Sequence, residues 1–528
     1  MLTNGTRNAS SQRMPFRLSP WIFPYIAMAC LPLLGCTIDR QLHTSAGLAG
    51  TTSKDSPYLK AHFKNGEVVV LHDWKIDGEG RSLEGRGEWL DMHRKIVNSG
   101  NLQVPVAEVA LFETNTKVVN AGPVAALTIV TVASLGVTAA CLVNPKACFG
   151  SCPTFYISDG EKDYLAAEGF SESVAPSLEA TDVDALWRAK VHGRTARLRV
   201  TNEALETHTI RQANLLVAPR PEHGRVLQTS DGRFVEATDF HPARMCRAAE
   251  GDCLPAVLAS DDLERVSVTD GHDLATRETV DLTFAEPATS AGTLGLVLEA
   301  RQGFITTFLF YQALAYMGHK AGNYLATMEQ GDEGIRNHAK DLHHILGGID
   351  VQLRDARGAW RTVGSYAETG PLAREVQVVP LPAGASGEQI RLVMARGHFR
   401  LGHVALARLG REVQPVRIPI TRIATKAGNA ALAQQWLAGR APQLVTLPGD
   451  EHALEYDLPE DGEGLELFLE ARGFYLEWMR QEWLAEESDW KLAGLFLRPS
   501  SALRDLAPAY KRVEPRIEAL FWESRYVR

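Results

Sequence analysis

Concentrated positive charge is missing from this chain. Its 528 residues carry 55 Lys and Arg against 64 Asp and Glu, a formal net charge of −9, and no run of basic residues occurs. Because nucleic-acid binding needs a concentrated basic face, we expect no nucleic-acid partner. The length exceeds what one hydrophobic core can organise, so we expect roughly three domains.

The short motifs of the commonest enzyme classes are also absent. We find no G-x-S-x-G elbow, no H-E-x-x-H, no P-loop and no EF-hand loop. A Ser/His/Asp triad needs no local motif, since its members lie far apart in sequence, but nothing here selects one serine over the others. We therefore predict no cofactor and favour a protein that is not an enzyme.

The N-terminus has the anatomy of an export signal. Residues 1–17 carry three arginines and no acid, and residues 18–34 are apolar apart from Ser19 and are interrupted by prolines. This segment is too short and too broken for a preferred spanning helix, so we predict a signal peptide over 1–35. It ends in Leu33-Leu34-Gly35-Cys36, which resembles the bacterial lipobox. The resemblance implies lipid on Cys36 and a membrane anchor.

The residues after Cys36 refine the predicted location. Thr37 stands where an Asp would resemble an inner-membrane retention signal, so we expect a cell-envelope protein at the outer membrane. Residues 44–56 are rich in Gly, Ser and Thr, which predicts a flexible tether over 36–57.

Cysteines are few, and five of the seven remain after removal of Cys30 with the signal and acylation of Cys36. In an oxidising compartment, the close pairs Cys148/Cys152 and Cys246/Cys253 predict two short-loop disulfides. Metal binding competes with this interpretation, but the spacings do not match the usual zinc patterns. Cys141 is left over in an apolar run.

That run, 121–143, has the length of a transmembrane helix. Lipid on Cys36 would hold 37–120 outside the cytoplasm, and a Cys148–Cys152 disulfide would need the same side. We therefore predict, over 121–145, an apolar helix that is buried or dips into the membrane surface, and we keep a true span as the alternative.

The hydropathy pattern predicts an α+β, multidomain chain that is rich in β-sandwich. Alternation near Val68–Leu71 indicates a β-meander over 58–120, and short strands with Gly/Asp turns indicate a β-sandwich over 146–302 and a second β region over 348–473. Apolar residues at three- and four-residue steps from Phe304 indicate a helical pair over 303–347, and we expect another helix over 426–438. Four of the ten tryptophans follow residue 475, which favours a packed, aromatic, helical tail over 474–528.

Some of these segments resemble known exported proteins. They are Cys152-Pro153-x-x-Tyr156-x-x-Asp159-Gly160, Leu198–Glu206, Ser230-Asp231-Gly232, Phe468…Gly473-Phe474-Tyr475-Leu476-Glu477-Trp478 and Phe521-Trp522-Glu523-Ser524-Arg525-Tyr526. They resemble a family of uncharacterised bacterial exported lipoproteins with a β-sandwich module. The resemblance implies architecture and location, and it carries no catalytic residue.

Two clusters could support chemistry. His338, Asp341 and His344, with His343 beside them, share faces of a predicted helix and are weak candidates for a metal site, although a solvated helix face explains them as well. Glu470, Glu477, Glu482, Glu486 and Glu487 flank Trp478 and Trp483, which look exposed and suggest a carbohydrate site.

Three functional hypotheses follow from these observations. The first is a non-enzymatic envelope protein that binds or scaffolds, with a possible envelope protein partner. The second is a hydrolase acting on glycan or peptide, and the third is a component of a secretion or surface-assembly system.

Overall fold

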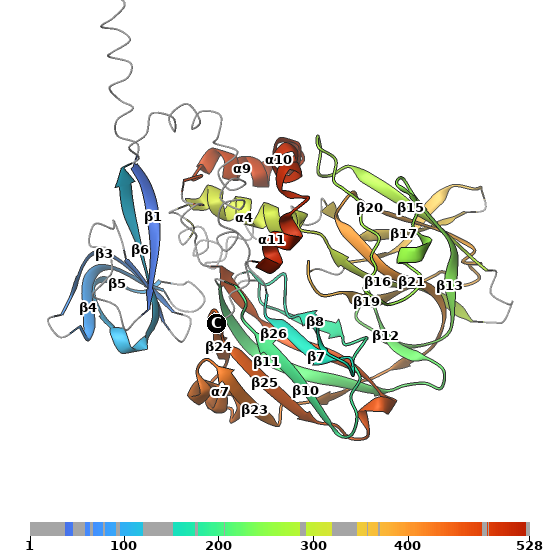
Figure 1. Ribbon diagram of the computed structural model, residues 1–528, viewed down its shortest axis with the longest axis horizontal. Coiled ribbons are helices and arrows are strands. Elements are labelled where there is room, and N and C mark those ends of the chain that lie inside the picture. Colours follow the sequence, from blue (N-terminus) through green and yellow to red (C-terminus); the bar gives the residue numbers. More distant parts are fainter. Residues whose placement is uncertain are drawn as a thin grey trace, which may run out of the picture.

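The chain is a strand-rich α+β protein with several sheets and few helices, as the sequence predicts (Figure 1). The computed structural model describes residues 37–45, 59–63, 67–77, 80–90, 96–119, 152–174, 178–204, 206–285, 292–318, 321, 346–355, 357–367, 370–477, 483 and 485–523. The predicted apolar segment 121–145 lies outside these residues. Within the described ranges, no helix is both long enough and apolar enough to cross a membrane.

A six-stranded antiparallel sheet forms the N-terminal part, in the order β1-β6-β2-β3-β4-β5. Its strands are β1 (Thr37–Ser45), β2 (Leu59–Phe63), β3 (Val68–Ile76), β4 (Ser82–Leu90), β5 (Ile96–Pro105) and β6 (Val109–Val119). Val69 and Leu71 point into its core and are fully buried, as their alternation with half-buried Val70 predicts. The predicted meander is therefore present. The predicted tether is wrong for Thr37–Ser45, because these residues pair along β6.

Two sheets pack face to face into a β-sandwich, the first β unit. One has the order β23-β25-β10-β7-β8 and the other β22-β11-β26-β9, with β24 paired to β11. Alternate apolar residues of both sheets share a single core. The strands are β7 (Thr154–Ser158), β8 (Asp163–Glu168), β9 (Ala180–Ala185), β10 (Thr195–Thr201), β11 (Glu206–Pro219), β22 (Val416–Ile418), β23 (Arg422–Ala427), β24 (Leu444–Thr446), β25 (Glu451–Asp457) and β26 (Leu465–Glu477).

The second β unit is a ten-stranded sheet with its own core, built from the residues between β11 and β22. Strand β13 joins its two halves, pairing with β21 on one side and with β15 on the other. The strands are β12 (Arg225–Thr229), β13 (Phe234–Ala248), β14 (Gly251–Asp252), β15 (Arg277–Phe284), β16 (Thr293–Gln302), β17 (Ile349–Arg354), β18 (Trp360–Tyr366), β19 (Glu375–Pro380), β20 (Gln389–Ala395) and β21 (Phe399–Val413).

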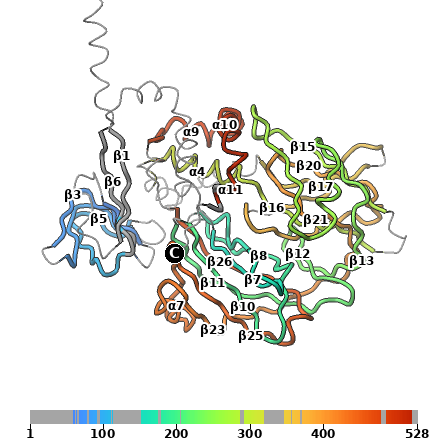
Figure 2. The backbone as a smooth tube through the Cα atoms, viewed as in Figure 1, coloured from blue at the N-terminus to red at the C-terminus, as the bar shows by residue number. Residues whose placement is uncertain are grey.

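The second unit is thus inserted into the first, which changes the predicted domain boundaries. The predicted sandwich over 146–302 and the second β region over 348–473 each contribute strands to both units. The longest strand pairing of the first unit joins Glu206 to Glu477 and Pro219 to Leu465. Figure 2 shows both units as one continuous path, with green and orange segments side by side in the lower one.

Four helices form a layer with a shared apolar core, above the first β unit and beside the second in Figure 1: α4 (Ile305–Met317), α9 (Asp489–Leu497), α10 (Pro499–Val513) and α11 (Ile517–Glu523). The helical periodicity at α4 is confirmed, since Phe308, Tyr311 and Leu314 are all buried. The predicted helical tail begins too early, because Phe474–Glu477 still belong to β26. Helix α7 (Ala430–Leu437) begins later than predicted, because β23 occupies 422–427.

An apolar cluster joins the two β units. The outer face of the β11/β26 sheet contributes Leu216 and Phe468, and the second unit contributes Val226, Phe234 and Val297. The rings of Phe234 and Phe468 meet edge to face, with centroids 4.9 Å apart. The contact between the units is therefore a packed core, and its margins can hold side chains in fixed positions.

Candidate functional site

A cavity of about 130 Å³ lies at the margin of the contact between the two β units. It is smaller than the clefts of about 300–1,000 Å³ that hold drug-sized ligands, so it suits a small molecule. Both units line it: Tyr164, Leu165 and Ala166 from β8, Ala185, Trp187 and Arg188 from the end of β9 and beyond, Asp262 from the loop before β15, Glu299 from β16, and Leu372, Arg374 and Val376 from β19 and its approach.

Glu299 is the most unusual residue of this cavity. It lies in β16, which is buried along all but its first residue, and is only 1% exposed. Its Oε1 is 3.6 Å from Arg374 Nη1, and its Oε2 has no hydrogen-bond partner among the described residues. Burial raises the pKa of this carboxyl, while the Ser260 hydroxyl and the charges of Arg374 and Arg188 act in the opposite direction. A buried acceptor without a donor is costly unless something supplies one.

Tyr164 presents a second unused polar atom. Its hydroxyl is buried and has no hydrogen-bond partner of normal geometry within the described part of the chain, although the backbone of Arg188 lies near it. Burial raises the pKa of Tyr164, Arg188 opposes this rise, and the negative charges of Glu375 and Asp159 add to it. The guanidinium of Arg188 lies 5.4 Å from the centre of the Tyr164 ring. The hydroxyl, rather than the ring face, is thus the part of Tyr164 that remains available.

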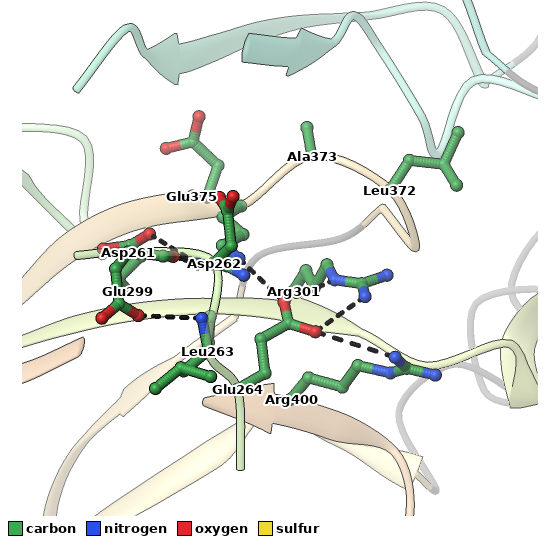
Figure 3. A network of polar contacts seen from close by, with 12 residues as sticks. Asp261, Asp262, Leu263, Glu264, Glu299, Arg301, Leu372, Ala373, Glu375 and Arg400 are labelled. Atoms are coloured by element: carbon green, nitrogen blue, oxygen red, sulfur yellow. Dashed lines mark hydrogen bonds and ion pairs between the residues drawn. The ribbon is translucent and has the colours of Figure 1, made fainter. Parts of the chain in front are cut away.

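An arginine–carboxylate network stands beside the cavity (Figure 3). Glu264 accepts hydrogen bonds from Arg301 Nε at 2.7 Å and from Arg374 Nε at 2.8 Å, and Arg400 Nη1 lies 3.7 Å from its other oxygen. Glu518 of α11 also accepts from Arg301, at 2.8 Å. Burial alone would raise the pKa of Glu264, but the hydrogen bond and charge of Arg301 hold it below its usual value. These charges are mutually satisfied, so the network fixes one wall of the cavity and ties α11 to the second unit.

A further polar contact closes the seam between the units. Glu168 of the first unit accepts hydrogen bonds from the backbone N–H groups of Leu372, at 2.6 Å, and Ala373, at 2.9 Å. Burial raises the pKa of Glu168 to about 7, against the effect of these two bonds. Gly370, at φ +127°, permits the close approach, because a Cβ there would lie 2.8 Å from Glu168 Oε2. A second contact has its donor in the first unit and its acceptor in the second: the Ala185 N–H donates to Glu375 at 3.0 Å.

The predicted cysteine sites have different outcomes. The Cys246–Cys253 disulfide is confirmed. Cys152 carries a free, buried thiol, so the predicted bridge from it to Cys148 is wrong. Burial, with the charges of Glu168 and Glu206, raises the pKa of the Cys152 thiol, which makes it a poor nucleophile. Cys36 and Cys148 lie outside the described residues.

The two other predicted clusters do not form this site. The predicted metal cluster lies outside the described residues: His338, Asp341, His343 and His344. Among the residues that the structure describes, no three His, Cys, Asp or Glu side chains gather as a metal site would require. Trp483 is fully buried against Tyr311, which contradicts its predicted exposure.

The C-terminal acids are engaged elsewhere. Glu470 is held by Arg417 and by Asn214, and Glu477 accepts a hydrogen bond from Tyr311 at 3.1 Å. Seven residues apart on one strand, the two glutamates face opposite sides of the sheet. Glu486 is buried, and Trp478 and Glu482 lie outside the described residues. The described acids therefore do not form the predicted carbohydrate site.

Sequence reasoning missed the cavity because its walls come from both units. One local signal was available: Glu299 interrupts the apolar run Leu294–Leu298, and a buried acid in a strand suggests a specific role. No protein-family model matches the chain, and no curated protein is similar to it in sequence.

Proposed function

We propose that this protein is a lipid-anchored cell-envelope protein that binds a small polar ligand in the cavity between its two β units, without transforming it. The observation that carries the binding role is the pair of buried, unused polar atoms there, Glu299 Oε2 and Tyr164 Oη. The export segment and Leu33-Leu34-Gly35-Cys36 support the anchored location.

The way the cavity is built favours binding. Glu299 and Tyr164 stand on strands of two units that share a packed apolar interface, so their positions are set before any ligand arrives. Preorganised polar groups in a small, mostly apolar cavity are typical of ligand sites. The neighbouring acid Asp262 is already paired with Arg188, at 3.1 Å, which leaves Glu299 as the acid with a free oxygen.

Membrane fractionation tests the anchor. We expect the Cys36→Ala variant to move from the membrane fraction to the released fraction, because loss of the acyl chains removes the anchor. Cys30→Ala is the matched control, since it changes a cysteine within the predicted signal and should leave the protein in the membrane fraction. Retention of Cys36→Ala in the membrane would contradict the lipid anchor and would favour insertion of 121–143.

A thermal-shift screen tests the binding role. Small cationic, neutral and anionic compounds are offered to the wild type and to Ala166→Leu, which places a larger side chain in the cavity wall. We expect at least one class to raise the Tm of the wild type and to lose this effect in Ala166→Leu. Ala431→Leu, on an exposed position of α7, is the control and should respond as the wild type does. The absence of any response from the wild type would count against the proposed function.

A further inference from the structure

We infer that the ligand of this cavity carries an ammonium group on a short apolar body, and that Glu299 Oε2 receives that group. This inference rests on the proposed function and deepens it by naming the ligand class.

The first argument is the hydrogen-bonding capacity of the site. A carboxylate oxygen can only accept, and Glu299 Oε2 is buried with no donor among the described residues. Tyr164, whose buried hydroxyl can also accept, lines the same cavity. An ammonium group offers three donors and no acceptor, so it suits a cavity whose unused polar atoms can both accept.

The second argument is charge. Around the cavity, ion pairs join four arginines to five carboxylates, and the charge of Lys162 also acts on Asp159 and Asp262, so every arginine there already has an acid as its partner. The arginines are Arg188, Arg301, Arg374 and Arg400, and the acids are Asp159, Asp262, Glu264, Glu299 and Glu518. An anionic ligand would therefore find each arginine already paired with a carboxylate, whereas a cationic ligand can donate to the unused oxygen of Glu299.

The third argument excludes other cations. A divalent metal ion needs several convergent oxygen ligands, and Glu299 offers one free oxygen. A quaternary ammonium group is recognised by aromatic faces, but Arg225 already covers the Trp187 ring at 3.6 Å and Arg188 lies over the Tyr164 ring. The remaining walls, Leu165, Ala166, Ala185, Leu372 and Val376, are apolar and suit a short carbon chain.

Three probes of nearly equal size test the inference on the full-length protein by titration calorimetry: n-propylamine as its hydrochloride, 1-propanol and sodium propionate. We expect the amine to bind more tightly than the alcohol and the acid. Glu299→Gln keeps the shape of the side chain and removes its charge, and it should weaken amine binding about tenfold or more, because hydrogen bonds to charged groups are the stronger ones. Glu412→Gln, at an exposed carboxylate of β21 far from the cavity lining, is the control and should bind as the wild type does.

A second variant keeps the test informative if Glu299→Gln does not fold. Tyr164→Phe removes one hydroxyl and should weaken amine binding several-fold. Equal or tighter binding of propanol or propionate, lost in Ala166→Leu, would overturn the ammonium inference while the binding role stands. Wild-type affinity for the amine in Glu299→Gln would also overturn it. If no compound of the wider screen binds, the proposed function fails with it.

Discussion

At the scale of single residues, Glu264 is expected to have a large effect on stability. It is buried and bonded to Arg301 and Arg374. Removing one partner of a buried ion pair leaves an uncompensated charge, which costs about 3–5 kcal/mol. We therefore expect Glu264→Ala to lose stability in this range, measured by urea unfolding.

Glu455→Ala is the matched control for that variant. Glu455 also pairs with two arginines, Arg197 and Arg422, but both of these are largely exposed to solvent. Water solvates them after the acid is removed, so the loss of stability should be much smaller. Equal losses in the two variants would show that burial does not govern the strength of these ion pairs.

Glu168 makes the seam between the units sensitive to pH. Its pKa is about 7 in the folded protein and near 4.5 in the unfolded chain, so folding favours the protonated acid. The stability that it contributes is complete below about pH 4.5 and is lost as the pH rises through 7. A shift of this size corresponds to about 3 kcal/mol.

Glu168→Gln tests this pH dependence. The amide oxygen can still accept from Leu372 and Ala373, and it does not titrate. We expect the variant to match the wild type near pH 5 and to be the more stable of the two near pH 8, in urea unfolding across this range. Glu161→Gln, on the exposed tip of the β7–β8 hairpin, should follow the wild type at every pH. A constant difference between Glu168→Gln and the wild type would contradict the prediction.

At the scale of elements, the Cys246–Cys253 disulfide closes the end of β13 onto β14. The two cysteines are seven residues apart, and the backbone N–H of Cys253 also bonds to the carbonyl of Cys246 at 3.0 Å. A disulfide that closes a short loop lowers the conformational entropy of the unfolded chain, which stabilises the folded protein by about 2 kcal/mol. We expect Cys246→Ala with Cys253→Ala to lose about this much in urea unfolding. Reductant should destabilise the wild type and leave the double variant unchanged.

The sequence predicts elements well where the signal is local. The alternation at Val68–Leu71, the three- and four-residue steps of α4 and the cysteine pair 246/253 each have a period or spacing that one segment carries by itself. The wrong predictions have a non-local cause. Thr37–Ser45 become a strand because β6 pairs with them, and Phe474–Glu477 stay in a strand because Glu206–Thr209 lie beside them. Neither partner is near in sequence.

At the scale of the whole molecule, non-local strand pairing is also the reason that the sequence does not predict the domain organisation or the site. The pairing of β11 with β26 encloses the entire second unit, and no periodicity of either strand specifies a partner at that separation. The cavity adds a second non-local step, since Tyr164 and Glu299 line one cavity only when both units have folded and docked. In the sequence, the feature that points to the site is the acid Glu299 next to the apolar run Leu294–Leu298.

Docking of the two units should be visible in how the molecule unfolds. Phe468 on β26 is 1% exposed and packs against Phe234 of the second unit. Phe468→Ala should cost about 3–5 kcal/mol, as truncation of a buried aromatic side chain does. Because the lost contact joins the units, we expect scanning calorimetry to resolve two transitions in place of one cooperative transition.

Leu469→Ala is the matched control for docking. Leu469 is the next residue of the same strand and points into the core of the first unit. Its truncation should lower the Tm by weakening that unit while the interface stays intact, so the transition should shift without splitting. The same comparison tests the binding role: Phe468→Ala should weaken ligand binding at the cavity, and Leu469→Ala should preserve it, because the cavity needs both units held together. Identical calorimetric profiles for the two variants would mean that the apolar cluster does not couple the units.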